Sequence, residues 1–200
     1  FMGQDRCRTC HIKIRNHLEF PTFLSETSIC FMFDPSEVIQ KARTSRFHLW
    51  LLNFTLSRTI PFNIPHGFKI LTLEDNRLYT KLPYKRKNLN HIKGMHACAL
   101  ATLSEFTTGF LLISRLGMKK YRIILQRLEM DYHFQGKMDA FGEFIATEEW
   151  LNTQIFTPLQ TQDSVVINCE IKIKDANGNH LTTGHVYWQI KDWQKVKTKT

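Results

Sequence analysis

Residues 97–114 read ACALATLSEFTTGFLLIS and contain one formally charged side chain, that of Glu105. An apolar run of this length is long enough to cross a bilayer. However, the hydroxyl side chains of Ser104, Thr107 and Thr108 lie in its middle, and the flanking segments have strand-like polar faces that need water. These features favour a helix buried in the core of a globular domain, and they predict no transmembrane segment.

Strand signals lie on both sides of this helix: a hairpin signal before it, with turn residues at Glu74-Asp75-Asn76, and segments with a two-residue period after it. In residues 165–174 apolar side chains alternate with Asn, Glu and Lys, and Asn177-Gly178 then predicts a tight hairpin. The expected strands are residues 68–73, 77–84, 127–134, 138–147, 165–174 and 181–190. One polar and one apolar face per strand predict an α+β fold, with an antiparallel β-sheet wrapped around the long central α-helix.

The residues before the first strand predict an N-terminal helix. The run DPSE at residues 34–37 is typical of a helix start, and apolar residues recur at helical spacing up to about residue 56. Pro61 and Pro65 then end the pattern. This helix is amphipathic enough to pack on the sheet or to lie on a membrane, and packing on the sheet is the commoner outcome.

Four segments are expected along the chain. Residues 1–31 have no sustained period and predict a peripheral or poorly ordered arm, whereas residues 32–66 hold the helix and its connection. Residues 67–191 form the main domain, and residues 192–200 form a basic tail.

The arm contains residues that could be assembled into a zinc-ligand set, namely Cys7, Cys10, His17 and Cys30. Structural zinc sites usually show two close ligand pairs, and only one close pair is present here. No metal site is therefore predicted.

The chain carries 27 Lys and Arg against 18 Asp and Glu, a net charge of +9, which favours an anionic partner. Nucleic acid, an anionic membrane surface and a phosphate-bearing ligand all meet that condition. No RNP-like aromatic run or helix-turn-helix pattern is present, so nucleic-acid binding is not expected. Five unevenly spaced cysteines and no signal-peptide pattern favour a reducing, cytoplasmic setting.

The one charge of the apolar helix has two interpretations. Burying a carboxylate without a partner costs several kcal/mol, so such groups become neutral, form a pair or face a cavity. Glu105 could lie at an exposed edge or pair with a nearby lysine. Alternatively, it could line a pocket with a raised pKa and act as a general base.

Residues 90–105, NHIKGMHACALATLSE, resemble the signature of PaaI-type hotdog thioesterases. That signature has an Asn, a Gly, a His-Gly-Gly that opens the helix, and an acidic residue nine positions after the His. Here Asn90 lies six residues before His96, Gly94 two before it and Glu105 nine after it. The chain looks most similar to an uncharacterised hotdog subgroup, over about residues 55–190.

The resemblance implies a thioester of coenzyme A or acyl-carrier protein as the substrate and partner, with no other cofactor. It implies that Glu105 activates water, that the Ala97 backbone N–H holds the thioester carbonyl, and that Asn90 orients substrate or water. Other residues would contact the substrate, with the basic ones meeting the phosphates of coenzyme A or an acidic carrier. These substrate-binding residues are His91, Gly94, His96, Cys98, Lys85, Arg86 and Lys87.

The family also implies a homodimer or a dimer of dimers. A carboxylate two turns along a helix cannot reach the start of the same helix, and the family pairs the Glu of one subunit with the helix start of the other. A helix start offers unsatisfied N–H groups that suit a developing oxyanion.

Two departures from the family pattern keep other functions open. His-Gly-Gly is replaced by His96-Ala97-Cys98, and residues 123–125 lack the hydroxyl that some members place on the strand after the helix. A non-catalytic acyl-thioester or lipid binder is the main alternative, and a dehydratase would need His91 or His96 opposite a carboxylate. These residues also have purely structural explanations. Asn90 could form hydrogen bonds with the loop backbone, His96 could cap the helix, and Cys98 is expected to be a small buried residue.

Overall fold

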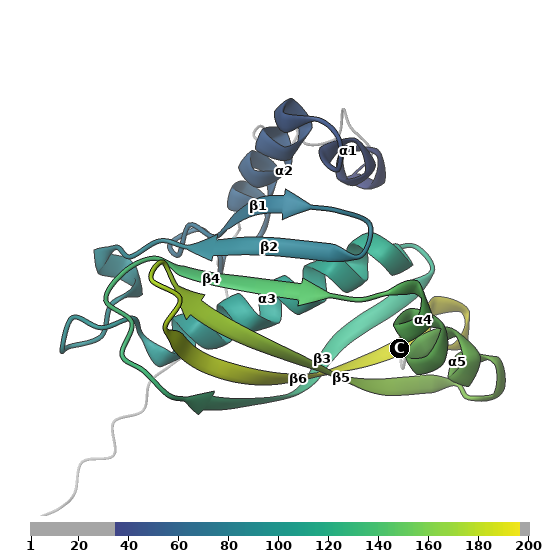
Figure 1. The fold of residues 1–200 in the computed structure, drawn as a ribbon. Coiled ribbons are helices and arrows are strands. Elements are labelled where there is room, and N and C mark those ends of the chain that lie inside the picture. Colours follow the sequence, from purple (N-terminus) through teal and green to yellow (C-terminus); the bar gives the residue numbers. More distant parts are fainter. Residues whose placement is uncertain (1–34, 197–200) are drawn as a thin grey trace, which may run out of the picture. The chain divides into compact units, whose positions relative to one another are not determined.

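The computed structural model describes residues 35–196. Six strands form one sheet in the order β1-β2-β4-β5-β6-β3, and every neighbouring pair is antiparallel. The strands are β1 (Lys69–Leu73), β2 (Arg77–Leu82), β3 (Tyr121–Tyr132), β4 (Ala140–Ile145), β5 (Ser164–Asp175) and β6 (His180–Asp192). The sheet curves around one long helix, α3 (Ala97–Leu116), as Figure 1 shows. The predicted α+β architecture is confirmed.

The helix α3 is the core of the domain, as predicted. By length and composition it could cross a membrane, but most of its apolar window is buried against the sheet. Its buried hydroxyls bond back to the carbonyl one turn earlier, with Thr107 Oγ1 at 2.7 Å from Leu103 O and Ser104 Oγ at 3.1 Å from Leu100 O. These bonds satisfy the polar groups that a buried helix would otherwise leave unpaired.

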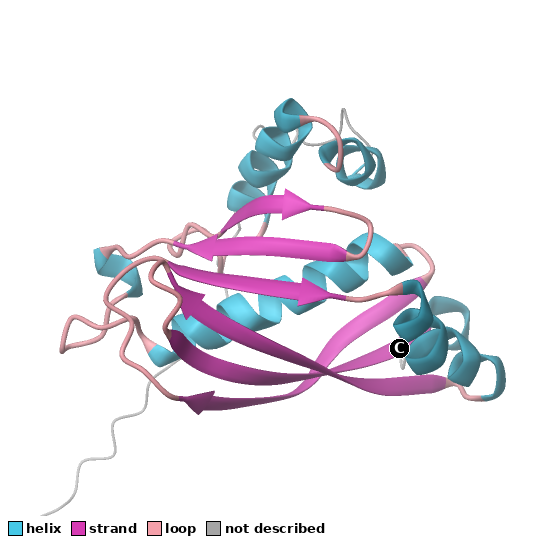
Figure 2. Ribbon diagram, viewed as in Figure 1, coloured by secondary structure: helices cyan, strands magenta, loops and turns pink. Residues whose placement is uncertain are grey.

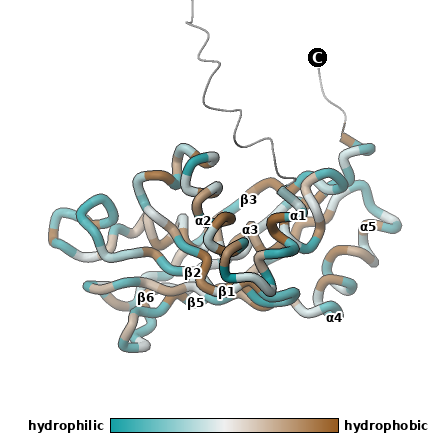
Figure 3. The backbone as a smooth tube through the Cα atoms, turned by 90° about the horizontal axis from the view of Figure 1, so that it is seen from above, coloured by the Kyte–Doolittle hydropathy of each residue, from teal (hydrophilic) through white to brown (hydrophobic). Residues whose placement is uncertain are grey.

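Close contacts fix α3 against the sheet. Gly109 lies under the Trp188 ring, where a Cβ atom would come within 2.5 Å of it. The Trp188 indole N–H donates to Thr108 Oγ1 at 3.0 Å, and Thr80 of β2 bonds to Thr107 at 2.6 Å. Figure 3 shows hydrophobic residues gathered where α1, α3 and β1 overlap, and hydrophilic residues in the outer loops.

The N-terminal helix expected over residues 36–56 is two helices, α1 (Pro35–Ala42) and α2 (Arg46–Thr59). Ser45 separates them, because its hydroxyl accepts a hydrogen bond from the His48 N–H and caps the start of α2. α2 lies beside β1, at one edge of the sheet (Figure 2), and α1 packs against α2 and α3.

The sequence predicted no element over residues 148–161, where the structure has a short helical segment. It comprises α4 (Glu148–Leu151), a π-helical turn η3 (Asn152–Phe156) and α5 (Thr157–Thr161). Thr147 caps its start by accepting from the Trp150 N–H, and Leu151 and Ile155 are fully buried.

The predicted hairpin after β5 is confirmed. Gly178 has φ of 82°, and the Asp175 carboxylate accepts from the backbone N–H groups of Asn177 and Asn179. The predicted arm and its cysteine and histidine set (Cys7, Cys10, His17, Cys30) lie outside the described residues, as does the end of the basic tail.

Candidate functional site

The loop before α3 is organised by Asn90. Its side-chain oxygen accepts from the N–H groups of Ile92, at 3.1 Å, and Gly94, at 2.9 Å. The Asn90 N–H donates to Gly94 O at 2.8 Å, so the loop closes on itself. Asn90 therefore does satisfy loop backbone, and its side-chain NH₂ is the group that remains to meet a ligand.

Two further residues shape this loop. Lys93 has φ of 58°, in the left-handed region that few side chains other than those of Asn and Asp adopt. A Cβ atom on Gly94 would lie 2.8 Å from the Gln135 side chain, so a larger residue here would require that exposed side chain to move. His91 and Ile92 at the loop tip are exposed.

The start of α3 is capped by His96. Its ring Nδ1 accepts from the Cys98 N–H at 3.1 Å, while the next N–H groups, those of Ala99 and Leu100, donate to His96 O. The Ala97 N–H has no acceptor among the described residues. The first turn therefore offers one free donor, at the position where the helix dipole is positive.

Cys98 is exposed beside this donor, which contradicts the expectation that it is buried. The reason is its position, since it faces away from the sheet in the first turn of α3. Together with Ala101, Thr102 and Glu105 it forms a stripe of incompletely buried residues at helical spacing, here called the open stripe of α3.

Two residues that the sequence did not single out hold the site in place. Asn88 is fully buried, and its side-chain NH₂ donates to the backbone carbonyls of His66 and Pro83. Its backbone carbonyl accepts a hydrogen bond from the His96 N–H. Tyr132 Oη donates to Ala97 O at 3.0 Å. The alternation of residues 127–134 placed Tyr132 on the apolar face of its strand, and this was the sequence signal that could have identified it.

Glu105 is partly buried on the open stripe. No residue in the range 35–196 donates a hydrogen bond to its carboxylate or forms an ion pair with it. Burial alone raises the pKa of Glu105 above its ordinary value, because desolvation disfavours the charged form. The interpretation in which it pairs with a lysine is thus not realised in the described part of the chain.

Within one chain, the carboxylate and the free N–H are separated along the helix. Glu105 is eight positions after Ala97, which corresponds to about 12 Å along the helix axis at 1.5 Å per residue. Tyr132, at the end of β3, bonds to Ala97 O, so the start of α3 lies next to β3.

Two groups of basic residues lie at opposite ends of α3. Lys85, Arg86 and Lys87 lie around the 3-10 turn η2 (Arg86–Asn88), close to the start of α3. Lys119 and Lys120 follow its C-terminal end, about 30 Å away for a helix of this length. Only the first group lies near the Ala97 N–H of the same chain.

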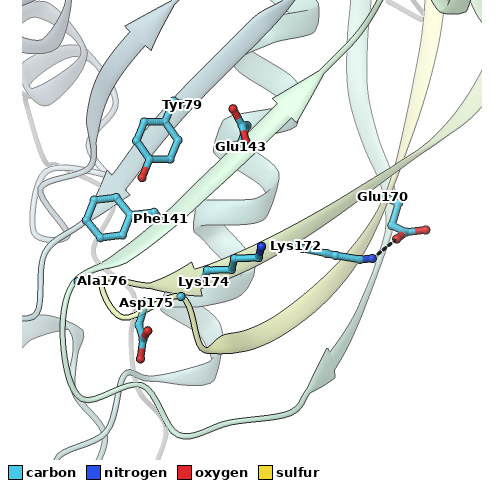
Figure 4. A pocket seen from close by; sticks show the side chains of 9 residues that line it. Tyr79, Phe141, Glu143, Glu170, Lys172, Lys174, Asp175 and Ala176 are labelled. Carbon is cyan, nitrogen blue, oxygen red and sulfur yellow. Dashed lines mark ion pairs between the residues drawn. The ribbon is translucent and has the colours of Figure 1, made fainter.

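A shallow, open depression lies elsewhere, on the outer face of the sheet (Figure 4). Tyr79 and Phe141 stack at one side of it, with ring centroids 5.7 Å apart, and the Glu170–Lys172 ion pair lies at the other. Its lining is charged and solvent-exposed, so it lacks the enclosed apolar surface of a substrate pocket. Among residues 35–196 no group of three or more His, Cys, Asp and Glu side chains could hold a metal ion.

A family model described as a domain of unknown function, DUF4442, matches residues 49–190. The chain belongs to this family. Its match begins within α2 and covers the whole sheet except the last residues of β6, together with the site built around α3. No curated protein sequence matches the chain.

Solved structures with the same fold come from several bacteria. A Pseudomonas aeruginosa protein described as a probable thioesterase has a TM-score of 0.66 at 21% identity, over 72% of this chain and 95% of that one. A Staphylococcus aureus thioesterase has a TM-score of 0.54 at 14% identity, over 66% and 99%. A Haemophilus influenzae thioesterase has a TM-score of 0.57 at 10% identity, over 72% and 90%. The fold of this DUF4442 protein is therefore the hotdog fold.

Proposed function

We propose that this DUF4442 protein hydrolyses acyl thioesters of coenzyme A or acyl-carrier protein, with Glu105 as the general base. One observation carries the proposal: the Glu105 carboxylate is partly buried without any described partner, which raises its pKa. A base whose pKa is raised toward neutrality accepts a proton from water more readily at physiological pH. The similarity to bacterial thioesterases supports the same reaction class.

The proposal requires two subunits. The Ala97 N–H and Glu105 of one chain are about 12 Å apart, too far to act on one carbonyl group. The outer edge of β3 pairs with no other strand in residues 35–196 and exposes Ile124 and Leu125. A second β3 placed along this edge would bring the open stripes of two α3 helices together, so that each site combines Glu105 with Ala97 of the partner subunit.

The chemistry then proceeds in two steps. Glu105 takes a proton from water as the water oxygen attacks the thioester carbonyl carbon, and the Ala97 N–H of the partner subunit stabilises the oxyanion. The tetrahedral intermediate collapses with cleavage of the C–S bond, and the proton on Glu105 passes to the departing thiolate. The side-chain NH₂ of Asn90 would orient the acyl group, and Lys85, Arg86 and Lys87 would contact the phosphates of coenzyme A.

A second candidate, binding without hydrolysis, is favoured by a specific observation. The methyl group of Ala97 and the exposed thiol of Cys98 stand where the PaaI-type signature, which residues 90–105 resemble, has two glycines, so the helix start is more crowded.

The test compares Glu105→Gln with the parent across acyl-CoA chain lengths, following substrate loss by chromatography. Loss of a general base is expected to lower kcat by at least about 100-fold. Affinity for a non-hydrolysable thioether analogue should change little, because the amide keeps the shape of the side chain. Glu149→Gln, at an exposed carboxylate on α4, is the matched control and should retain full activity.

Equal turnover by Glu105→Gln and the parent would rule out this mechanism. A parent protein that binds the analogue but turns over no acyl-CoA would identify the protein as a binder instead.

A further inference from the structure

The outward face of α2 carries three exposed aromatic side chains. Phe47 is 64% exposed, Trp50 59% and Phe54 45%, and they recur at positions i, i+3 and i+7 on one side of the helix. Their rings stack along the helix, with centroids 6.0 Å apart for Phe47 and Trp50 and 5.7 Å apart for Trp50 and Phe54. These three residues are called the aromatic face of α2.

The orientation of α2 is fixed by its opposite side. Leu52 is buried in the core, and Asn53 bonds to both backbone groups of Ile70 on β1. The Asn53 amide donates to Ile70 O at 2.9 Å, and its oxygen accepts from Ile70 N–H at 2.7 Å. The helix cannot turn its aromatic face inward without breaking both bonds, so this face stays toward the solvent.

The surroundings of the aromatic face are basic. Residues 38–73 contain no Asp or Glu and five Lys and Arg, of which Lys41 and Arg43 pair with Glu37 and Asp75 just outside that range. Arg46, Arg58 and Lys69 are exposed, and the Arg58 guanidinium lies 4.8 Å from the centre of the Phe54 ring. Charge complementarity therefore calls for an anionic partner, which disfavours a second copy of this chain with its own net charge of +9.

We infer that the aromatic face of α2 docks onto the surface of an anionic lipid bilayer. Aromatic side chains flanked by arginines are the pattern of helices that lie in the membrane interface, with the rings among the acyl chains and the cations at the headgroups. At 14 residues, α2 is about 21 Å long and too short to span a bilayer. It would lie flat on the surface.

The ring geometry favours lipid over nucleic acid. Base binding needs free aromatic faces on which bases can stack. Here Trp50 has Phe47 on one side and Phe54 on the other, and Arg58 lies over the Phe54 ring. Trp50, the central ring, has a stacked neighbour on each side and so offers no free face to a base, although 59% of the residue remains exposed for insertion among acyl chains.

The test is co-sedimentation of the full chain with vesicles of phosphatidylcholine alone or with about 30% phosphatidylserine. The parent should bind the anionic vesicles and bind the neutral ones at least about tenfold more weakly. The triple variant Phe47→Ala, Trp50→Ala, Phe54→Ala should lose at least about tenfold in binding to anionic vesicles. Arg46→Glu with Arg58→Glu should remove the preference for anionic lipid.

Matched controls change the same quantities elsewhere. Ile145→Ala with Val166→Ala removes exposed apolar surface from the outer face of the sheet, and Lys172→Glu with Lys174→Glu makes the same change in net charge. Both should bind anionic vesicles as the parent does. So should Glu105→Gln, because docking does not depend on the proposed hydrolysis.

If the triple variant folds poorly, tryptophan fluorescence of the parent protein provides an independent test. Lipids brominated in their acyl chains should quench the parent's tryptophan fluorescence, and Trp50→Phe should lose most of that quenching. Absence of parent binding to anionic vesicles, or equal binding by the triple variant, would overturn the inference. So would a triple variant that changes only the oligomeric mass or only the binding of single-stranded RNA.

Discussion

At the scale of single residues, Glu105 differs from most charged groups of the domain. Arg43, Arg77 and Arg115 each pair with a carboxylate from another part of the chain, and such pairing keeps both charges favourable. Glu105 has no such partner in the described part of the chain, and burial raises its pKa. Its ionisation therefore opposes folding, as is common for groups held ready for chemistry.

This predicts a pH-dependent stability difference between Glu105→Gln and the parent. Because the folded pKa is raised, the native state keeps the proton longer than the unfolded state, and the stability of the parent falls as pH rises from 4.5 through the folded pKa. Glu105→Gln lacks this loss. It should unfold at a higher urea concentration than the parent at pH 7, and the difference should shrink below pH 4.5.

The control for this comparison is Glu149→Gln, whose carboxylate is exposed. Its difference from the parent should not vary with pH in the same way. A Glu105→Gln variant that is less stable than the parent at pH 7 would show that the carboxylate has a stabilising partner.

At the scale of elements, α2 has apolar side chains on two sides, and the sheet covers only one of them. Leu52 is buried, whereas Phe47, Trp50 and Phe54 are exposed. The side that packs inward is selected by Asn53, which bonds to β1 as a neighbouring strand would. The same contact covers the β1 edge of the sheet, an edge that would otherwise expose unpaired backbone groups.

Replacing Asn53 with alanine should therefore loosen α2 from the sheet. Two hydrogen bonds are lost and the backbone groups of Ile70 are left partly unpaired, so the free energy of unfolding should fall by about 1–3 kcal/mol. Urea denaturation measures the change. Asn168→Ala, at an exposed position on β5, should change the free energy of unfolding by less than about 0.5 kcal/mol. Equal effects of the two variants would contradict the role of Asn53.

At the scale of the whole molecule, the two edges of the sheet differ in whether another element covers them. The β1 edge is covered by α2, whereas β3 is 12 residues long and exposes Ile124 and Leu125. Such an edge favours association with another strand. In the proposed hydrolase this association is also what completes the site.

We therefore expect light scattering to give twice the chain mass of 23.6 kDa. Ile124→Lys with Leu125→Lys should weaken self-association at least about tenfold, because like charges would meet across the two-fold axis. Acyl-CoA hydrolysis should fall with the fraction of dimer. Ile145→Lys, at an apolar position 55% exposed on β4, should leave the mass unchanged, and a monomeric parent would exclude the two-subunit site.

Much of the fold was predictable because its signals are local. The two-residue period of β5 and the turn at Asn177-Gly178 depend on neighbouring residues, and so does the apolar run of α3. Elements that depend on tertiary contacts were missed. The segment at residues 148–161 is short and is held by the burial of Leu151 and Ile155, so its own sequence gave no strong period.

The candidate site divides in the same way. The sequence by itself determined a central helix opened by His96, a turn built on Asn90 and one charge, Glu105, in an apolar surrounding, because spacing along a chain fixes positions along a helix. Only the tertiary structure decided that Cys98 is exposed, that Asn88 and Tyr132 hold the helix start, and that Glu105 has no described partner. Burial and pairing depend on segments that the fold brings together from far apart in the sequence, and no local pattern records them.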